Sequence, residues 1–82
     1  MKSSHVLALK FIIAMKDNKD VENLDIFKTK EDDKWEYYYQ IDGYLNFKPF
    51  FAFFSKHKET SIEQVTVTGS ASQQIKQILE SL

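Results

Sequence analysis

Ten of the chain's twelve aromatic residues lie between Trp35 and Phe54, in the stretch WEYYYQIDGYLNFKPFFAFF. Each Phe or Tyr carries a large apolar area, and a contiguous exposed patch of such area is unfavourable in water. One hairpin cannot hide this much aromatic surface by pairing with itself. The stretch therefore predicts a hairpin that is buried on one face and is covered, or used for binding, on the other.

Length and composition predict one small folded domain spanning residues 1–82. A chain of this size buries only roughly 60–65% of the surface that its unfolded form exposes, so its core is small. Apolar residues make up 43% and charged residues 28% of the 82 residues, and there are only two Gly and one Pro. These values are typical of a globular protein rather than of a disordered chain.

The charge balance and the absence of cysteine make several functions less favoured. All eleven positive side chains are lysines, and twelve carboxylates bring the net charge to −1. Arginine is the side chain best shaped for bidentate recognition of phosphate or guanine, so its absence disfavours sequence-specific nucleic-acid binding. Without cysteine, neither disulfides nor thiolate chemistry is available.

The first apolar run does not resemble a signal peptide or a membrane span. Lys10 interrupts it, no small-residue cleavage site follows, and it is too short to cross a bilayer. We expect a cytoplasmic protein that has no membrane partner.

The N-terminal segment Val6–Met15 has large apolar residues at its odd positions, from Leu7 to Met15. This period of two predicts a strand. A helix is the rival interpretation, but it would be apolar almost all round, which a small domain can hardly bury. Whether this segment is strand or helix stays open here.

Further strands are predicted at Leu24–Lys30, Trp35–Ile41 and Val65–Thr68. The charged run Glu31–Lys34 reads as the turn between the first two of these.

The turn of the aromatic hairpin decides which side chains share a face. Asp42-Gly43 is a typical turn pair, and a three-residue loop Ile41–Gly43 with Gly43 at positive φ keeps the faces unmixed. This register pairs Tyr39 with Leu45, Tyr37 with Phe47, Trp35 with Pro49 and Glu36 with Lys48.

The end of the chain predicts an amphipathic helix at Ser72–Leu82. Gly69 ends the preceding strand, Ser70 and Gln73 form a capping-box pattern, and apolar residues follow at helical spacing: Ile75, Ile78, Leu79 and Leu82. The expected fold class is α+β, an antiparallel meander sheet of four or five strands with this helix packed on one face.

No residue pattern names a reaction. His57 and Glu59 form an H-x-E fragment, but no second histidine or cysteine pair lies nearby to complete a zinc site. We expect no metal and no cofactor, and the sequence favours a function that is not enzymatic.

The candidate site is the face of the aromatic hairpin that points away from the core. In the predicted register, the core side holds six aromatic residues: Trp35, Tyr37, Tyr39, Phe47, Phe51 and Phe53. The outward side holds the predicted partner-binding residues: Tyr38, Tyr44, Phe50 and Phe54. Because interfaces are enriched in Tyr and Phe, we expect a protein-interaction or regulatory module whose partner is another protein chain, in the simplest case an identical one.

Two alternative functions use the same aromatic residues. Single-stranded nucleic acid could stack on Tyr38, Tyr44 and Phe50, with Lys34, Lys48 and Lys56 beside them. A small apolar ligand or an enzyme substrate could occupy an aromatic pocket, although convergent polar groups are lacking.

Overall fold

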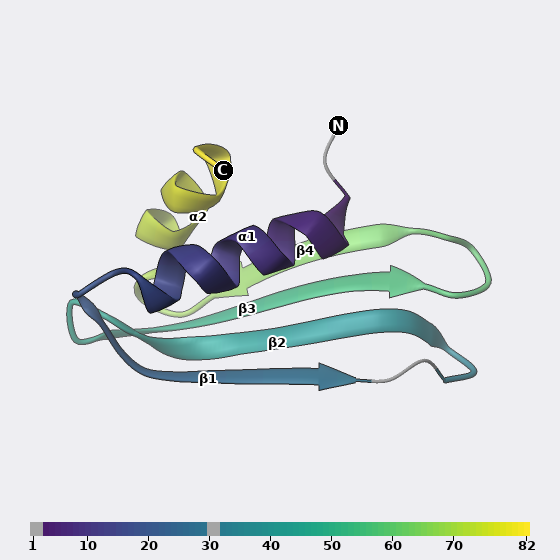
Figure 1. Ribbon diagram of the computed structural model, residues 1–82, viewed down its shortest axis with the longest axis horizontal. Coiled ribbons are helices and arrows are strands. Elements are labelled where there is room, and N and C mark those ends of the chain that lie inside the picture. Colours follow the sequence, from purple (N-terminus) through teal and green to yellow (C-terminus); the bar gives the residue numbers. More distant parts are fainter. Residues whose placement is uncertain (1–2, 30–31) are drawn as a thin grey trace.

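The computed structural model describes residues 3–29 and 32–82. The elements follow in the order α1 (Ser4–Lys16), β1 (Val21–Thr29), β2 (Trp35–Leu45), β3 (Lys48–His57), β4 (Glu63–Thr68) and α2 (Ser72–Glu80). The four strands form one antiparallel sheet in the order β1-β2-β3-β4, and both helices lie on the same side of it (Figure 1). The predicted α+β class with a meander sheet and a C-terminal helix is confirmed.

The N-terminal segment is a helix, so the strand prediction for Val6–Met15 is wrong and the helical rival is right. Ser3 caps the helix, because its side chain accepts a hydrogen bond from the Val6 N–H at 3.1 Å. The buried stripe consists of Ser4, Ala8, Phe11 and Met15, which lie three or four residues apart.

The strand prediction failed because it required every apolar residue of this segment to be buried. The helix instead leaves Val6, Leu9 and Ile13 exposed on the side opposite the sheet. A helix that is apolar all round is therefore compatible with this small domain, at the cost of an uncovered apolar stripe.

The aromatic hairpin turns at Asn46-Phe47, and the prediction of a turn at Ile41–Gly43 is wrong. Leu45 pairs with Lys48, and the two turn residues have φ of 51° and 66°, as a type I′ turn requires. Asn tolerates this left-handed conformation better than most residues. Strand β2 consequently continues through Asp42-Gly43.

Gly43 serves the strand rather than the turn. A Cβ atom at this position would lie 3.1 Å from the backbone oxygen of Glu22 and 3.3 Å from the Cα atom of Leu24. These atoms belong to an irregular stretch of β1, where the register shifts and Asn23 has φ of 54°. The glycine therefore permits the close approach of β1 to β2.

The new register reverses β3 relative to the prediction. Tyr39 pairs with Phe54 and Ile41 with Ala52, so the even-numbered residues of β3 face the helices. A second irregularity lies between Trp35 and Tyr37, which pair with His57 and Lys56 respectively. Because of this bulge, Trp35 and Tyr37 leave the sheet on opposite sides.

The remaining elements lie close to their predicted positions. Strand β1 begins earlier than the predicted Leu24 and ends at Thr29, and β4 begins at Glu63 rather than at Val65. The predicted turn Glu31–Lys34 lies partly outside the described residues. Within it, the Asp32 carboxylate accepts hydrogen bonds from the backbone N–H groups of Trp35 and Lys34, which hold its pKa below the usual value.

Helix α2 is confirmed, although it ends at Glu80 rather than at the predicted Leu82, and its predicted cap is not formed. The N-cap residue is Ala71, which provides no side-chain hydrogen bond, so Ser70 and Gln73 do not form the expected capping box. Gly69 has φ of 100°, and a Cβ atom there would lie 2.5 Å from the Pro49 oxygen. Only glycine fits this link between β4 and α2.

One core lies between the sheet and the two helices. Its largest fully buried side chains are Phe11, Met15, Ile41, Phe50, Phe54 and Ile75. The helices thus cover one face of the sheet, and neither of them lies on the other.

Candidate functional site

The uncovered side of the sheet carries four aromatic side chains that contact one another. Antiparallel partners share a face of the sheet. Phe54 is buried beneath the helices, so its neighbour Phe53 projects away from them. The same outward row contains the partners of Phe53 across the sheet: Phe27, Gln40 and Thr66. We call Phe27, Trp35, Tyr38 and Phe53 the aromatic face.

The rings of the aromatic face form a continuous cluster. Tyr38 stacks on Phe53 with ring centroids 5.2 Å apart, and Trp35 meets both rings edge-on at 6.0 Å and 6.2 Å. Phe27 extends the cluster to β1, with its centroid 6.1 Å from that of Tyr38. Such contacts hold the rings in place, so the cluster is a preformed surface.

The aromatic face is partly open to solvent. Phe27 is 54% exposed, and the other three side chains are half-buried. A hollow of about 220 Å³ adjoins Trp35 and His57. This volume is below that of a pocket for a drug-sized ligand, so the face is better suited to contact with a larger surface.

The four predicted partner-binding residues are not brought together. Tyr38 belongs to the aromatic face, and Tyr44 shares its side of the sheet but lies six residues further along β2, about 20 Å away at roughly 3.3 Å per residue. The expectation that Phe50 and Phe54 face outward is wrong, since both are buried beneath the helices. The displaced turn is the reason, because it reverses every side chain of β3.

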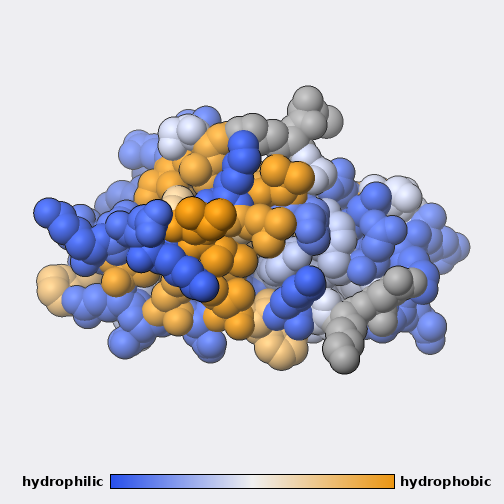
Figure 2. All heavy atoms as spheres, viewed as in Figure 1, coloured by the Kyte–Doolittle hydropathy of each residue, from blue (hydrophilic) through white to orange (hydrophobic). Residues whose placement is uncertain are grey.

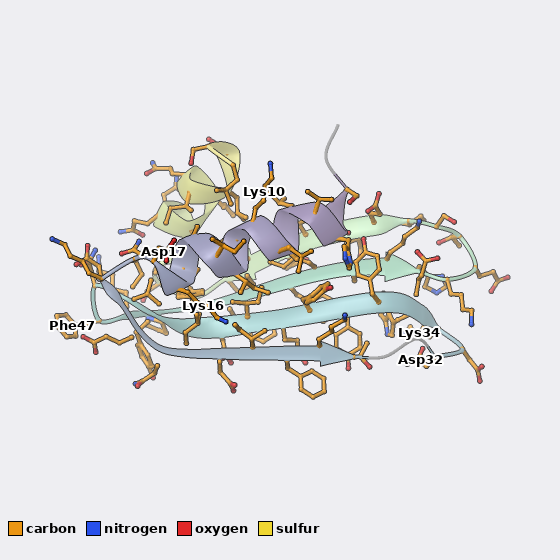
Figure 3. All side chains as sticks on the ribbon, viewed as in Figure 1. Lys10, Lys16, Asp17, Asp32, Lys34 and Phe47 are labelled. Atoms are coloured by element: carbon orange, nitrogen blue, oxygen red, sulfur yellow. The ribbon has the colours of Figure 1, made fainter. Side chains whose placement is uncertain are left out.

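The predicted core aromatics divide in the same way. Tyr37 and Tyr39 lie on the helix side, as expected. Trp35, Phe51 and Phe53 lie on the opposite side, and Phe47 is 81% exposed at the hairpin turn. Figure 3 shows Phe47 at one end of the sheet and Lys34 at the other.

Sequence reasoning missed Phe27, which it placed in a strand without assigning it a face. The signal that could have located the aromatic face is Asn46, because Asn at the first central position of a two-residue loop is typical of type I′ turns. A turn there pairs Tyr38 with Ser55 and places Phe53 beside it.

Carboxylates occupy the other end of the same side of the sheet. Asp25 and Asp42 are direct cross-strand partners, and both line an open hollow of about 360 Å³. Like charges that face each other across two strands are destabilising and repel anionic ligands. The outer side therefore combines an aromatic end with an acidic end.

The lysines predicted to flank the aromatic residues do not surround them. Lys34 lies over the Trp35 ring, with its Nζ atom 5.1 Å from the ring centroid. Lys56 points to the helix side, where it forms a 3.2 Å ion pair with Glu36. Lys48 pairs with Leu45 on that side as well.

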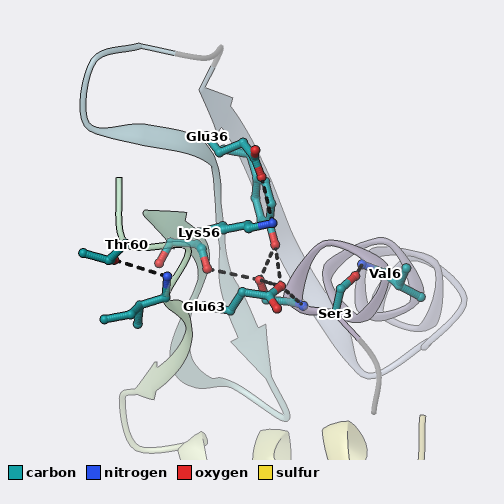
Figure 4. A network of polar contacts seen from close by, with 10 residues as sticks. Ser3, Val6, Glu36, Lys56, Thr60 and Glu63 are labelled. Carbon is teal, nitrogen blue, oxygen red and sulfur yellow. Dashed lines mark hydrogen bonds and ion pairs between the residues drawn. The ribbon is translucent and has the colours of Figure 1, made fainter. Parts of the chain in front are cut away.

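A polar network on the helix side attaches the first turn of α1 to the sheet (Figure 4). The Glu63 carboxylate accepts hydrogen bonds from the Ser4 N–H at 2.9 Å and from the Tyr37 hydroxyl at 3.0 Å. The Ser4 hydroxyl lies within hydrogen-bonding distance of the Tyr37 hydroxyl, the Ser55 carbonyl and the same carboxylate. A carboxylate at the start of a helix also complements the helix dipole.

The network shifts the pKa values of Glu63 and Tyr37. The hydrogen bonds from Ser4 and Tyr37, that of the Ser4 backbone foremost, hold the pKa of the Glu63 carboxyl below its usual value. Burial raises the pKa of the Tyr37 hydroxyl, and the neighbouring Glu63 carboxylate adds to the rise. The hydrogen bonds of this network fasten the first turn of α1 to β2 and β4.

The helix side also carries an apolar patch. Figure 2 shows hydrophobic side chains gathered over α1 and α2 and bordered by polar residues. The exposed residues of α1 in this patch are Val6, Leu9 and Ile13.

Comparisons with protein-family models, with curated proteins and with solved structures gave no match. Within residues 3–29 and 32–82, no helix has the length and apolar character needed to cross a membrane.

Proposed function

We propose that the protein is an interaction module that binds another protein chain, in the simplest case a second copy, through the aromatic face. The observation that carries the proposal is the cluster of Phe27, Trp35, Tyr38 and Phe53 on the side of the sheet that neither helix covers. The buried centres of protein interfaces are enriched in Tyr, Trp and Phe.

Two properties of the aromatic face support this function. Its rings already contact one another, so little side-chain freedom is lost when a partner binds. Its neighbours in the central row, Gln40 of β2 and Thr66 of β4, are uncharged, which suits the desolvated centre of an interface. A cytoplasmic location remains part of this proposal.

Single-stranded nucleic acid has less support as the ligand. The stacked pair Tyr38 and Phe53 leaves no space between its rings for a base. Asp25 and Asp42 on the same side of the sheet repel phosphates, and Lys48 and Lys56 lie on the other side.

The experiment compares molar mass over a dilution series for the wild type and two variants. Sedimentation equilibrium should show the wild type associating with rising concentration, and Phe27→Ser combined with Tyr38→Ser should weaken this association by at least about tenfold, since central aromatic residues dominate interface energies. Both changes lie on the outer side of the sheet, so circular dichroism should change little.

Phe47→Ser is the matched control. It removes an aromatic ring that is more exposed than Phe27 but lies at the hairpin turn, outside the aromatic face. Its association constant should equal that of the wild type. Equal weakening by Phe47→Ser would show that general hydrophobic stickiness, rather than the aromatic face, drives association.

A further inference from the structure

The two edges of the sheet differ in how they avoid pairing with another strand. An edge strand presents unpaired backbone N–H and C=O groups, and natural proteins protect such edges with charges, bulges or proline. Edge strand β1 has this protection, because it carries Glu22, Asp25 and Lys28 and is interrupted by an irregular stretch at Asn23.

Edge strand β4 has less of this protection, because its one charged residue is Glu63, at the first position of the strand. Between Gln64 and Thr68 it has neither a charge nor a proline, its pairing with β3 is regular, and its residues are the strong strand formers Val65, Thr66, Val67 and Thr68. All its residues except Val67 are exposed. The strand is therefore accessible and chemically suited to further pairing.

The ladder between β3 and β4 determines which backbone groups are free. The His57 N–H donates to the Ile62 carbonyl at 2.8 Å, next to the first residue of β4. Because bonded and non-bonded pairs alternate in an antiparallel ladder, Gln64, Thr66 and Thr68 direct their backbone groups toward β3. Those of Glu63, Val65 and Val67 point away from the sheet.

We propose that β4 pairs antiparallel with β4 of a second copy, which joins two sheets into one of eight strands. The sequence is self-complementary for this pairing about a two-fold axis at Thr66. Val65 then exchanges backbone hydrogen bonds with Val67 of the second copy, and Thr66 lies opposite its own equivalent. Valine pairs occupy one face and threonines the other, both favourable cross-strand combinations.

Helix α2 also favours the addition of a strand at this edge. In Figure 1, α2 begins next to β4 and leads away from it on the side opposite β3. Its apolar residues change from fully buried at Ile75 to half-buried at Ile78 and Leu79, and Leu82, which follows the helix, is half-buried as well. A strand added to β4 lies beside these side chains and removes more of their area from water.

This proposal goes beyond the aromatic face and does not depend on it, although a dimer of this kind would place two aromatic faces on the same side of one sheet. The partner that this pairing favours is an identical strand. The sequence Val65-Thr66-Val67 is the same in both directions from Thr66, as a two-fold axis at that residue requires.

The test is residue-specific amide hydrogen exchange of the purified full chain at low and high concentration. The Val65 and Val67 amides should exchange quickly in the dilute monomer and slow by at least about tenfold when the dimer forms, because hydrogen bonding is what protects amides. The Thr66 amide, which already faces β3, should be protected at both concentrations.

A second experiment introduces opposite charges at Thr66, the residue on the two-fold axis. Thr66→Lys and Thr66→Glu should each weaken dimerisation, because like charges then face each other, and an equimolar mixture of the two should restore it. Thr60→Lys, in the exposed turn before β4, is the matched control and should dimerise like the wild type.

Two results would overturn the pairing of β4. One is fast exchange at Val65 and Val67 at every concentration. The other is a mixture of the Thr66→Lys and Thr66→Glu variants that associates no better than either variant alone. A dimer that is lost in Phe27→Ser while Val65 and Val67 exchange fast throughout would overturn the β4 proposal and support the aromatic face as the only contact.

Discussion

Phe53 and Phe54 are neighbours in β3 whose side chains leave the sheet on opposite sides. Phe54 is fully buried and contacts Phe11 of α1, with centroids 5.6 Å apart. Phe53 lies on the outer side, where its ring contacts Trp35 and Tyr38 of the aromatic face. Identical substitutions at the two positions therefore separate the function of the core from that of the outer surface.

We expect Phe54→Ala to lower the free energy of unfolding by about 3–5 kcal/mol, because it leaves a cavity between the sheet and α1. Phe53→Ala should cost less than about 2 kcal/mol, since the lost ring is already partly solvated. Urea titrations of both variants measure the difference. A larger loss for Phe53 than for Phe54 would contradict the assignment of the two faces.

Glu63 predicts a pH dependence of stability. Its pKa is lower in the folded protein than in the unfolded chain, so its hydrogen bonds to Ser4 and Tyr37 stabilise the fold above the unfolded pKa of about 4.5. This contribution is lost as the pH falls from there through the lower folded pKa. Glu63→Gln should therefore flatten the decline of stability below about pH 5.

The measurement is a set of urea midpoints between pH 3 and pH 7 for the wild type and the variant. Glu59→Gln, in the exposed turn before β4, removes the same charge and should leave the wild-type slope unchanged. A wild-type slope in Glu63→Gln would mean that the carboxylate does not fasten α1.

Among the elements, the β2–β3 hairpin shows where sequence reasoning failed. The alternation in β2 correctly predicted a strand with Tyr37 and Tyr39 inward. The turn was misplaced because Asp42-Gly43 matches a common turn pair, whereas Gly43 is required by the backbone of β1, which a local pattern cannot reveal. One misplaced turn then exchanged the inward and outward residues of β3.

The turn itself allows a stabilising change. Phe47 adopts φ of 66°, which is unfavourable for a residue with a Cβ atom, and its side chain is 81% exposed. Because Asn-Gly is the preferred pair for a type I′ turn, Phe47→Gly should raise the free energy of unfolding by about 1 kcal/mol. Thermal unfolding measures this gain, and a clear loss of stability would contradict the turn geometry.

The helices were predictable to different degrees. Four apolar residues on one side made α2 evident from its spacing, although its cap was not. In α1 the buried and exposed sides are equally apolar, so no periodicity separated a helix from a strand. Which side of α1 is exposed is decided by how the helix packs on the sheet, and the local sequence does not reveal this packing.

At the scale of the whole molecule, the two helices and four strands of residues 3–29 and 32–82 are too few to cover both faces of the sheet. The helices bury one face, and the aromatic face stays open on the other. The sequence predicted that such an open face exists and that it includes Tyr38, but its remaining members depended on the turn and on the bulge at Trp35. Both features arise from contacts between strands.

Quenching of tryptophan fluorescence tests the central claim most directly, because Trp35 is the only tryptophan of the chain and belongs to the aromatic face. Acrylamide should quench Trp35 readily in the dilute monomer, and the quenching constant should fall by at least about twofold as concentration rises and a second chain covers the rings. The Phe27→Ser, Tyr38→Ser variant should keep the monomer value over the same range. A quenching constant that stays at the monomer value while the wild type associates would contradict binding through the aromatic face.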